Sequence, residues 1–152
     1  MIEVADAETA RELILEYATT LGIDLHFQDF EQELATLTTF YEIILVDRRQ
    51  PGGVPAGCVA LRRIDHETCE MKRLYVRPQF RGKDLGRALA EHVIGEARKR
   101  GYQRMRLDTL PSMTAAMDLY RQLGFVEIAP YRFNPVEGSK FMELTLAYNP
   151  AP

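Results

Sequence analysis

One stretch of the sequence combines glycines, basic side chains and a helical pattern in an order suited to phosphate binding. Residues 74–89 read LYVRPQFRGKDLGRAL, which predicts a strand, a turn and the start of a helix. The first N–H groups of a helix lack internal partners and form the positive end of its dipole, so they can bind an anion. Gly82 and Gly86 would let the main chain approach a bulky phosphate. Three side chains in the turn add positive charge: Arg81, Lys83 and Arg87.

An ordinary helix start that uses glycine only for its turn is the alternative explanation of this segment. The segment is not a P-loop, because the Gly-Lys-Ser/Thr ending is missing. It is not a dinucleotide fingerprint either, because the preceding strand belongs to a predicted hairpin rather than to a parallel βαβ unit. If the turn binds a phosphate, the ligand is therefore of another kind.

The elements that would position this turn are expected to form a mixed sheet with helices on both faces, an α/β or α+β fold. Apolar spacing predicts helices from Asp6 to Leu21, within residues 23–37, over Leu85–Arg100 and over Thr114–Leu123. Strands are expected at Ile2–Val4, Phe40–Val46, Ala56–Ile64, Thr68–Val76, Tyr102–Leu107, Phe125–Ile128 and Phe141–Leu146.

The third and fourth of these strands should pair as a hairpin whose turn centres near His66. That register places Cys69 opposite Arg63 and Cys58 opposite Leu74, so the two cysteines should not form a disulfide. No Cys/His spacing suggests a zinc site, and no metal is expected.

Composition limits the function classes. The chain has 152 residues, 46% of them hydrophobic, which suits a single domain over residues 1–152. A net charge of −3 argues against general nucleic-acid binding. No apolar run approaches the roughly 20 residues of a membrane helix, and the short acidic N-terminus does not read as a secretory signal, so a soluble, cytoplasmic protein is expected. The segment 72–106 is basic, which suits an anionic ligand, and the first 42 residues are mostly acidic, which suits a cationic ligand. The alternative is that both segments are ordinary solvated faces.

The basic turn resembles the signature of the GNAT superfamily of acetyl-CoA-dependent N-acetyltransferases. That signature, Gln/Arg-x-x-Gly-x-Gly/Ala, lies between the family's fourth strand and third helix. Arg81 and Gly86 match its first and last positions, whereas Asp84 replaces the middle glycine. Because Asp tolerates a left-handed backbone, the turn is expected to survive, with the Asp84 carboxylate pointing away from the phosphates.

A second segment, AMDLYRQLGF over residues 116–125, resembles the family's Ala-x-x-x-Tyr-x-x-x-Gly-Phe pattern, although Met113 stands where many members carry Asn. The resemblance covers nearly the whole chain. It implies the GNAT-like acyl-CoA N-acyltransferase fold, with about seven mostly antiparallel strands, about four helices and a sheet splayed where the coenzyme enters. It also implies acetyl transfer from acetyl-CoA to a primary amine, by direct attack in a ternary complex.

The same resemblance implies roles for individual residues. The coenzyme-binding set is Leu74, Tyr75, Val76, Arg81, Gly82, Lys83, Asp84, Leu85, Gly86, Arg87 and Tyr120. Tyr120 would protonate the departing thiolate, helped if the basic turn lowers its pKa; packing against Phe125 is its alternative role. Glu70 would be the base that deprotonates the amine, unless it only pairs with Lys72 or Arg63 and an ordered water is the base. A main-chain N–H near Leu74, where the family's strand bulges, would stabilise the oxyanion.

The acceptor is an amine whose identity the sequence leaves open. Candidate acceptor contacts are His26, Phe27, Phe30 and Asn134. Family members often dimerise, so a homodimer is compatible with the sequence. A non-catalytic coenzyme A-binding sensor or regulatory domain is the alternative function, which Asp84 favours. A toxin acting on charged transfer RNA fits less well, because the acceptor-side segment is acidic.

Overall fold

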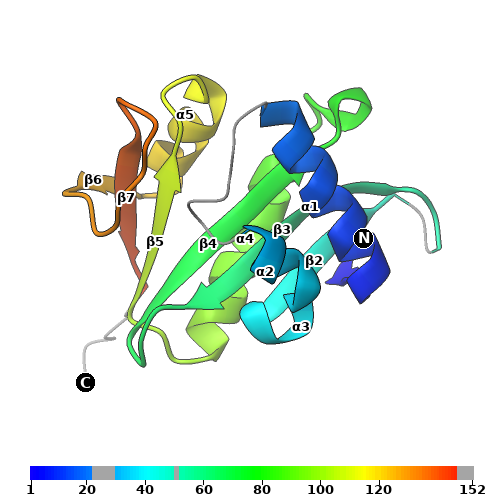
Figure 1. The fold of residues 1–152 in the computed structure, drawn as a ribbon, viewed down its shortest axis with the longest axis horizontal. Helices are drawn as coiled ribbons and strands as arrows, with labels where there is room; N and C mark the ends of the chain where they lie inside the picture. Colours follow the sequence, from blue (N-terminus) through cyan, green and yellow to red (C-terminus); the bar gives the residue numbers. More distant parts are fainter. Residues whose placement is uncertain (22–29, 50–51, 147–152) are drawn as a thin grey trace.

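The computed structural model describes residues 1–21, 30–49 and 52–146, and within these ranges seven strands form one mixed sheet (Figure 1). The strand order is β1-β2-β3-β4-β5-β7-β6. The strands are β1 (Ile2–Val4), β2 (Ile43–Arg48), β3 (Pro55–Arg63), β4 (Thr68–Val76), β5 (Arg104–Thr109), β6 (Val126–Ile128) and β7 (Lys140–Thr145). Neighbouring strands pair antiparallel except β4 and β5, which are parallel.

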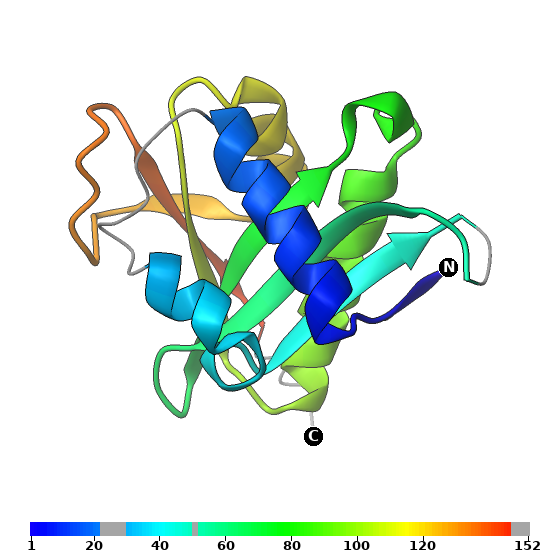
Figure 2. The ribbon, with the colours of Figure 1, turned by 45° about the vertical axis from the view of Figure 1, so that its right-hand side comes forward.

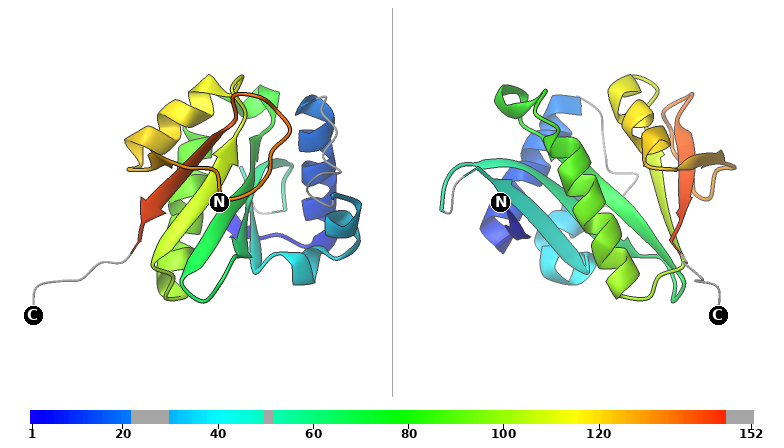
Figure 3. Two further views of the ribbon diagram at one scale, coloured as in Figure 1. Left: turned by 60° about the vertical axis from the view of Figure 1, so that its left-hand side comes forward. Right: turned by 180° about the vertical axis from the view of Figure 1, so that it is seen from behind.

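Helices cover both faces of the sheet (Figure 3). Those of the described ranges are α1 (Ala7–Leu21), α2 (Phe30–Ala35), α3 (Leu37–Phe40), α4 (Leu85–Lys99), α5 (Thr114–Gln122) and the short 3-10 turn η2 (Pro78–Phe80). Helices α1, α2 and α3 lie on one face, and α4 and α5 lie on the other. In the parts of the chain so described, every helix is too short or too polar to span a membrane.

Apolar stripes fix the helices to the sheet. Leu89, Val93 and Ala97 recur at helical spacing along α4 and are fully buried against strand residues such as Leu61 and Met105. On the opposite face Ala10 and Ile14 of α1 pack against Ile44 and Ala60. The start of α1 is capped as the sequence predicts, because Asp6 Oδ1 accepts a hydrogen bond of 2.8 Å from the Thr9 N–H.

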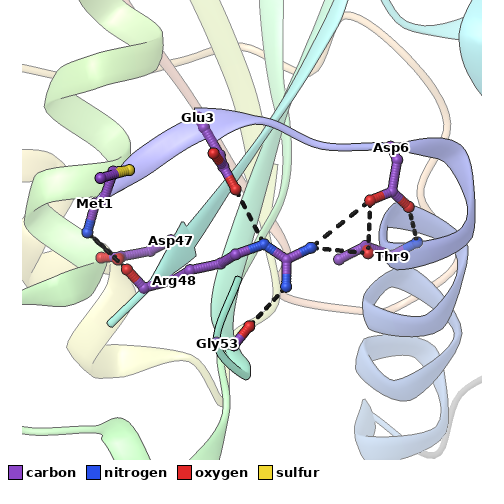
Figure 4. Close-up of polar contacts among 7 residues, drawn as sticks. All are labelled: Met1, Glu3, Asp6, Thr9, Asp47, Arg48 and Gly53. Atoms are coloured by element: carbon purple, nitrogen blue, oxygen red, sulfur yellow. Dashed lines mark hydrogen bonds and ion pairs between the residues drawn. The ribbon is translucent and has the colours of Figure 1, made fainter. Parts of the chain in front are cut away.

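A polar cluster joins the N-terminal elements at the β1 edge (Figure 4). The Arg48 guanidinium donates to Glu3 Oε1 at 3.0 Å, to the Gly53 carbonyl at 2.7 Å and to Thr9 Oγ1 at 3.1 Å. The same guanidinium lies 3.6 Å from Asp6 Oδ2. Arg48 therefore connects β1, α1 and β2. Strand β1 is one edge of the sheet, whereas the parallel pair β4–β5 lies within it (Figure 2).

Most of the expected fold is confirmed, and the differences in the helices and strands themselves are largest in residues 23–48. The helix expected within 23–37 is present as α2, and a further short helix, α3, follows it, so the described residues contain five α-helices where about four were expected. The strand expected over Phe40–Val46 begins only at Ile43, because Phe40 ends α3. Phe40 is apolar in either element, so its type alone did not decide between them.

The hairpin of β3 and β4 contains a bulge that the sequence pattern did not show. Cys69 lies opposite Arg63 as expected, but Cys58 faces Tyr75 rather than Leu74, so that part of the register prediction was wrong. Two residues of β4, Arg73 and Leu74, occupy the length of one residue of β3, and the register shifts by one from there. Both cysteines are buried and free, which confirms that they form no disulfide.

Strands β4 and β5 separate along their length, as Figure 1 shows. They pair only from Thr68–Glu70 to Arg104–Arg106. Beyond that point β4 runs on to Val76 and β5 to Thr109 without pairing to each other. The sheet therefore opens beyond Glu70, along the part of β4 that contains the bulge and leads to the basic turn before α4.

Candidate functional site

Three adjoining hollows follow the opening between β4 and β5. The outer hollow, of about 440 Å³, lies at the turn before α4. The middle hollow, of about 460 Å³, lies between the end of β4 and the start of α5. The inner cavity, of about 50 Å³, lies between the separated strands. The outer and middle hollows share Val76, Arg81, Gly86, Ala115 and Leu119. The middle and inner ones share Tyr17, Leu21, Leu74 and Met113, so the three adjoin one another in a row, which is called the path below.

The outer hollow is built on the turn that the sequence analysis singled out. Asp84 adopts the left-handed conformation expected of it, with φ 58° and ψ 22°, and its carboxylate caps no N–H of the helix. Gly82 is also left-handed, with φ 81°. Arg81 is fixed by a 3.0 Å hydrogen bond from its Nε to the Val76 carbonyl, and Arg87 bonds to Gln122 on α5. The N-terminus of a 15-residue helix therefore opens onto a hollow with basic side chains at its rim.

Most of the expected coenzyme residues line this path. The outer hollow is lined by Val76, Arg81, Gly82, Asp84, Leu85, Gly86 and Arg87, and the middle one also by Leu74 and Tyr75. Lys83 is exposed and lines none of the three spaces, so it could contribute only long-range charge. The middle hollow is mostly apolar, which suits a flexible chain with few charges.

Tyr120 projects from α5 into the wall of the inner cavity and is 7% exposed. Its ring also packs on Phe125, with 5.7 Å between ring centroids, so both roles weighed for this residue have a geometric basis. Burial raises the pKa of Tyr120 above its ordinary value, and Tyr17 and Asp108 add to the effect. This is opposite to the lowering that the sequence suggested, because no basic side chain of the turn contributes. Tyr120 is thus a neutral O–H donor at physiological pH.

Glu70 is fully buried on β4 and does not line the inner cavity. Its Oε2 accepts a hydrogen bond of 2.6 Å from the Tyr131 hydroxyl and another from Arg132. Its Oε1 lies 4.0 Å from Nζ of Lys72. The predicted pairing with Lys72 is therefore present, whereas Arg63 is not among the partners of Glu70 in the described structure.

Lys72 itself lines the inner cavity and is 5% exposed. Burial lowers the pKa of Lys72 to about 8, against the opposing pull of Glu70, and Arg73 and Arg132 lower it further. A buried amine with such a pKa can accept a proton near neutral pH, unlike an ordinary lysine.

Two further cavity residues come from β5 and could not be found from local patterns. Asp108 lies in the wall of the inner cavity and accepts a 3.1 Å hydrogen bond from Asn134 Nδ2. Thr109 is buried there, and its Oγ1 has no hydrogen-bond partner among the residues that the structure places. Asn134, expected to contact the acceptor, lines the same cavity. The only signal for Asp108 and Thr109 was their position at the end of a strand, which does not by itself show that the sheet opens there.

The other expected acceptor contacts are not brought into this geometry. His26 and Phe27 lie outside the described residues. Phe30 begins α2, and only its main chain is described.

Comparisons with known proteins agree with this arrangement. The acetyltransferase (GNAT) family model matches residues 7–125. An uncharacterized N-acetyltransferase of Schizosaccharomyces pombe is 38% identical over 146 residues, covering 93% of this chain and 90% of the relative. A solved structure from Klebsiella pneumoniae, assigned as an acyl-CoA N-acyltransferase, aligns with a TM-score of 0.74 and 28% identity over 97% of each chain. A Salmonella typhimurium protein solved with its cofactor acetyl-CoA aligns with a TM-score of 0.70 and 26% identity, covering 100% of this chain and 96% of the other.

Proposed function

We propose that this chain, which belongs to the acetyltransferase (GNAT) family and is an acyltransferase, transfers an acetyl group from acetyl-CoA to a primary amine of a small molecule or peptide. The observation that carries the proposal is the row of adjoining hollows that leads from the basic turn of α4 to Tyr120. One end of that path suits a pyrophosphate, its middle suits the pantetheine chain, and its inner end suits a thioester. The family uses acetyl-CoA, which has these three parts in this order.

In this proposal the pyrophosphate binds at the outer hollow. The free N–H groups of the first turn of α4 donate to the phosphate oxygens, and Arg81 and Arg87 add charge. Gly86 leaves room for the close approach of the main chain. The Asp84 carboxylate is the one unfavourable charge that this turn places in the wall, and the left-handed backbone keeps it from capping the helix.

The reaction joins the amine nitrogen to the thioester carbon and then breaks the carbon–sulfur bond. The main chain near Leu74 donates a hydrogen bond to the carbonyl oxygen as it becomes negative. Tyr120 donates its O–H to the departing sulfur. Because the pKa of Tyr120 is raised, full proton transfer to a thiolate is uphill, so the hydrogen bond itself supplies most of the stabilisation. The products are an amide and coenzyme A as the thiol, with one proton released when the amine starts as an ammonium.

The amine must lose a proton before it attacks, since an alkylammonium with a pKa near about 10 has no lone pair to donate. We assign this step to Lys72 and Glu70 together. Lys72, with a pKa of about 8, is partly neutral near neutral pH and lines the cavity. Glu70, 4.0 Å from Lys72 Nζ, favours the protonated form of that lysine, so it supports proton uptake without touching the acceptor. Asp108 offers a carboxylate that attracts a cationic acceptor into the same cavity.

A coenzyme A-binding sensor without transferase activity is the second candidate, and Asp84 is the feature that favours it. An anion beside a phosphate site would suit a protein that responds to coenzyme concentration through weak binding. The two functions differ in one respect: only an enzyme passes the acetyl group to an amine.

The experiment is a panel of amines incubated with the protein and acetyl-CoA. The panel contains amino acids, polyamines, aminoglycosides and peptides with free N-termini, and release of the coenzyme A thiol is recorded against time. Thiol release must require both the protein and the amine, and mass spectrometry must find the acetylated amine. Thiol release that is independent of the amine indicates hydrolysis only. Coenzyme binding without any acetylated product across the panel would favour the sensor.

A further inference from the structure

Arg73 has an unusual main-chain conformation for its residue type. Its φ is 58°, and it shares a left-handed backbone only with Asp84 among the non-glycine residues that the structure describes. Unlike Asp84, arginine has no short polar side chain to favour this conformation locally. It therefore persists only because the surroundings impose it.

The Arg73 side chain lies in a buried ion pair with Glu33 of α2. Arg73 Nε donates to Glu33 Oε2 at 2.9 Å, and Arg73 Nη2 donates to Glu33 Oε1 at 2.6 Å. The Tyr41 hydroxyl donates to the same Oε2 at 2.5 Å. Glu33 is 0%, Tyr41 2% and Arg73 7% exposed, so water cannot replace these bonds. The hydrogen bonds with Glu33 outweigh the burial that would lower the pKa of Arg73, and the guanidinium stays charged.

The pair acts on the part of β4 that faces the thioester in the proposed function. Arg73 and Leu74 are the two residues of the bulge, and both line the inner cavity. The left-handed turn of the chain at Arg73 decides the direction of the peptide N–H that follows it, at Leu74. A bidentate arginine–carboxylate pair fixes orientation as well as distance, which a lysine or a single hydrogen bond does not.

We infer that the Glu33–Arg73 ion pair is a positioning device, which holds the β4 bulge so that the main chain at Leu74 donates to the thioester carbonyl. Helix α2 is then part of the catalytic apparatus, although neither Glu33 nor Tyr41 lines the cavity. The inference rests on the proposed acetyl transfer. It adds that Arg73 acts through the main chain of its neighbour rather than on the substrate.

The test compares Glu33→Gln, Arg73→Gly and the double variant. Glycine adopts the left-handed conformation without strain, so Arg73→Gly removes the pair while permitting the bulge. Each single variant should lower kcat by roughly tenfold to a hundredfold, as expected for a misplaced oxyanion donor, with unchanged affinity for acetyl-CoA. The kcat of the double variant should be no lower than that of the slower single variant, because either substitution already breaks the same ion pair. Tyr41→Phe removes only the hydroxyl that donates to Glu33, so it should lower kcat by a smaller factor. This variant tests the inference if the other variants do not fold.

A spectroscopic measurement separates positioning from general stability. Infrared spectra of acetyl-CoA labelled with carbon-13 at the carbonyl should show the thioester band shifted to lower frequency on binding the unaltered protein. Glu33→Gln should return the band toward its position in free acetyl-CoA. Arg48→Gln is the matched control, because it breaks an arginine cluster of similar size at the β1 edge (Figure 4). It should lower the melting temperature but change neither kcat nor the band.

Three results would overturn the inference: kcat and the carbonyl band unchanged in Glu33→Gln and Tyr41→Phe, additive losses in the double variant, or an equal loss of kcat in Arg48→Gln. Failure of the proposed function looks different. In that case the unaltered protein itself neither transfers acetyl groups nor shifts the carbonyl band.

Discussion

Replacing Gly86 with Val tests the role of the α4 turn in coenzyme binding. A Cβ at this position would lie 3.8 Å from side-chain atoms of Leu119 and of Val76, which is ordinary contact, so the variant should fold. The branched methyl groups must then project into the hollows that Gly86 lines. They would push a phosphate away from the main chain and lengthen at least one charge-assisted hydrogen bond, worth about 1.5–3 kcal/mol. We therefore expect affinity for acetyl-CoA to fall about tenfold or more, which corresponds to about 1.4 kcal/mol.

Calorimetric titration with acetyl-CoA measures this loss, and the same helix provides the control. Gly95 also lies in α4, and a Cβ added to it would have no neighbour within 4 Å among the residues that the structure describes. Gly95 also lines none of the three hollows. Gly95→Val should therefore bind acetyl-CoA as the unaltered protein does. Equal affinity in a folded Gly86→Val variant would refute the placement of the pyrophosphate at this turn.

Three further predictions concern single side chains. Asp84→Gly should bind acetyl-CoA equally or more tightly in titrations, because it removes an anion and relieves left-handed strain of about 1 kcal/mol; weaker binding would mean that the carboxylate makes a needed contact. Tyr120→Phe should lower turnover by about 10²- to 10⁴-fold in single-turnover kinetics with coenzyme affinity unchanged, and unchanged turnover would reduce Tyr120 to packing on Phe125. In the unaltered protein, Lys72 should raise the free energy of unfolding by about 2 kcal/mol as the pH rises from 7 to about 9.5; Lys72→Met should lack this rise, as measured by urea denaturation.

The sign of the Lys72 effect follows from its lowered pKa. Between pH 8 and about 10.5 the unfolded chain keeps the proton that the folded chain has released, so stability rises with pH. Below pH 8 both states are protonated, and the full cost of the buried charge is present. The two buried cysteines, whose pKa values are raised to about 12, make stability fall as the pH rises above the ordinary pKa of a thiol. The quantity to follow is therefore the difference in stability between Lys72→Met and the unaltered protein, in which the effect of the cysteines cancels. A difference that does not vary with pH would contradict a buried amine with a lowered pKa.

The conformation of the turn before α4 could be predicted from the sequence, whereas the inner cavity could not, and the reason is physical. The turn from Arg81 to Arg87 is a local structure whose glycines, charges and helix start are adjacent in the chain. Even the left-handed backbone of Asp84 could be predicted, because it depends on residue type and turn geometry. The inner cavity instead depends on where β4 and β5 separate, which is a property of the assembled sheet.

The bulge is the clearest case of this limit. A single extra residue in β4 leaves the apolar alternation of Thr68–Val76 looking like a regular strand, and the predicted pairing of Cys58 was therefore one residue out. Glu33 and Arg73 are 40 residues apart in sequence, and nothing near either of them indicates the other. The raised pKa of Tyr120 likewise reflects burial in the assembled core, with smaller contributions from Tyr17 of α1 and Asp108 of β5, and none of these can be seen in the sequence of α5.

A crystal structure with coenzyme A bound is the measurement that tests the central claim most directly. The account predicts the pyrophosphate on the N–H groups at the start of α4, the pantetheine chain along the middle hollow and the sulfur within hydrogen-bonding distance of the Tyr120 hydroxyl. The main chain at Leu74 should then face the position of the acetyl carbonyl. A coenzyme bound away from the opening between β4 and β5, or with its sulfur remote from Tyr120, would contradict the account.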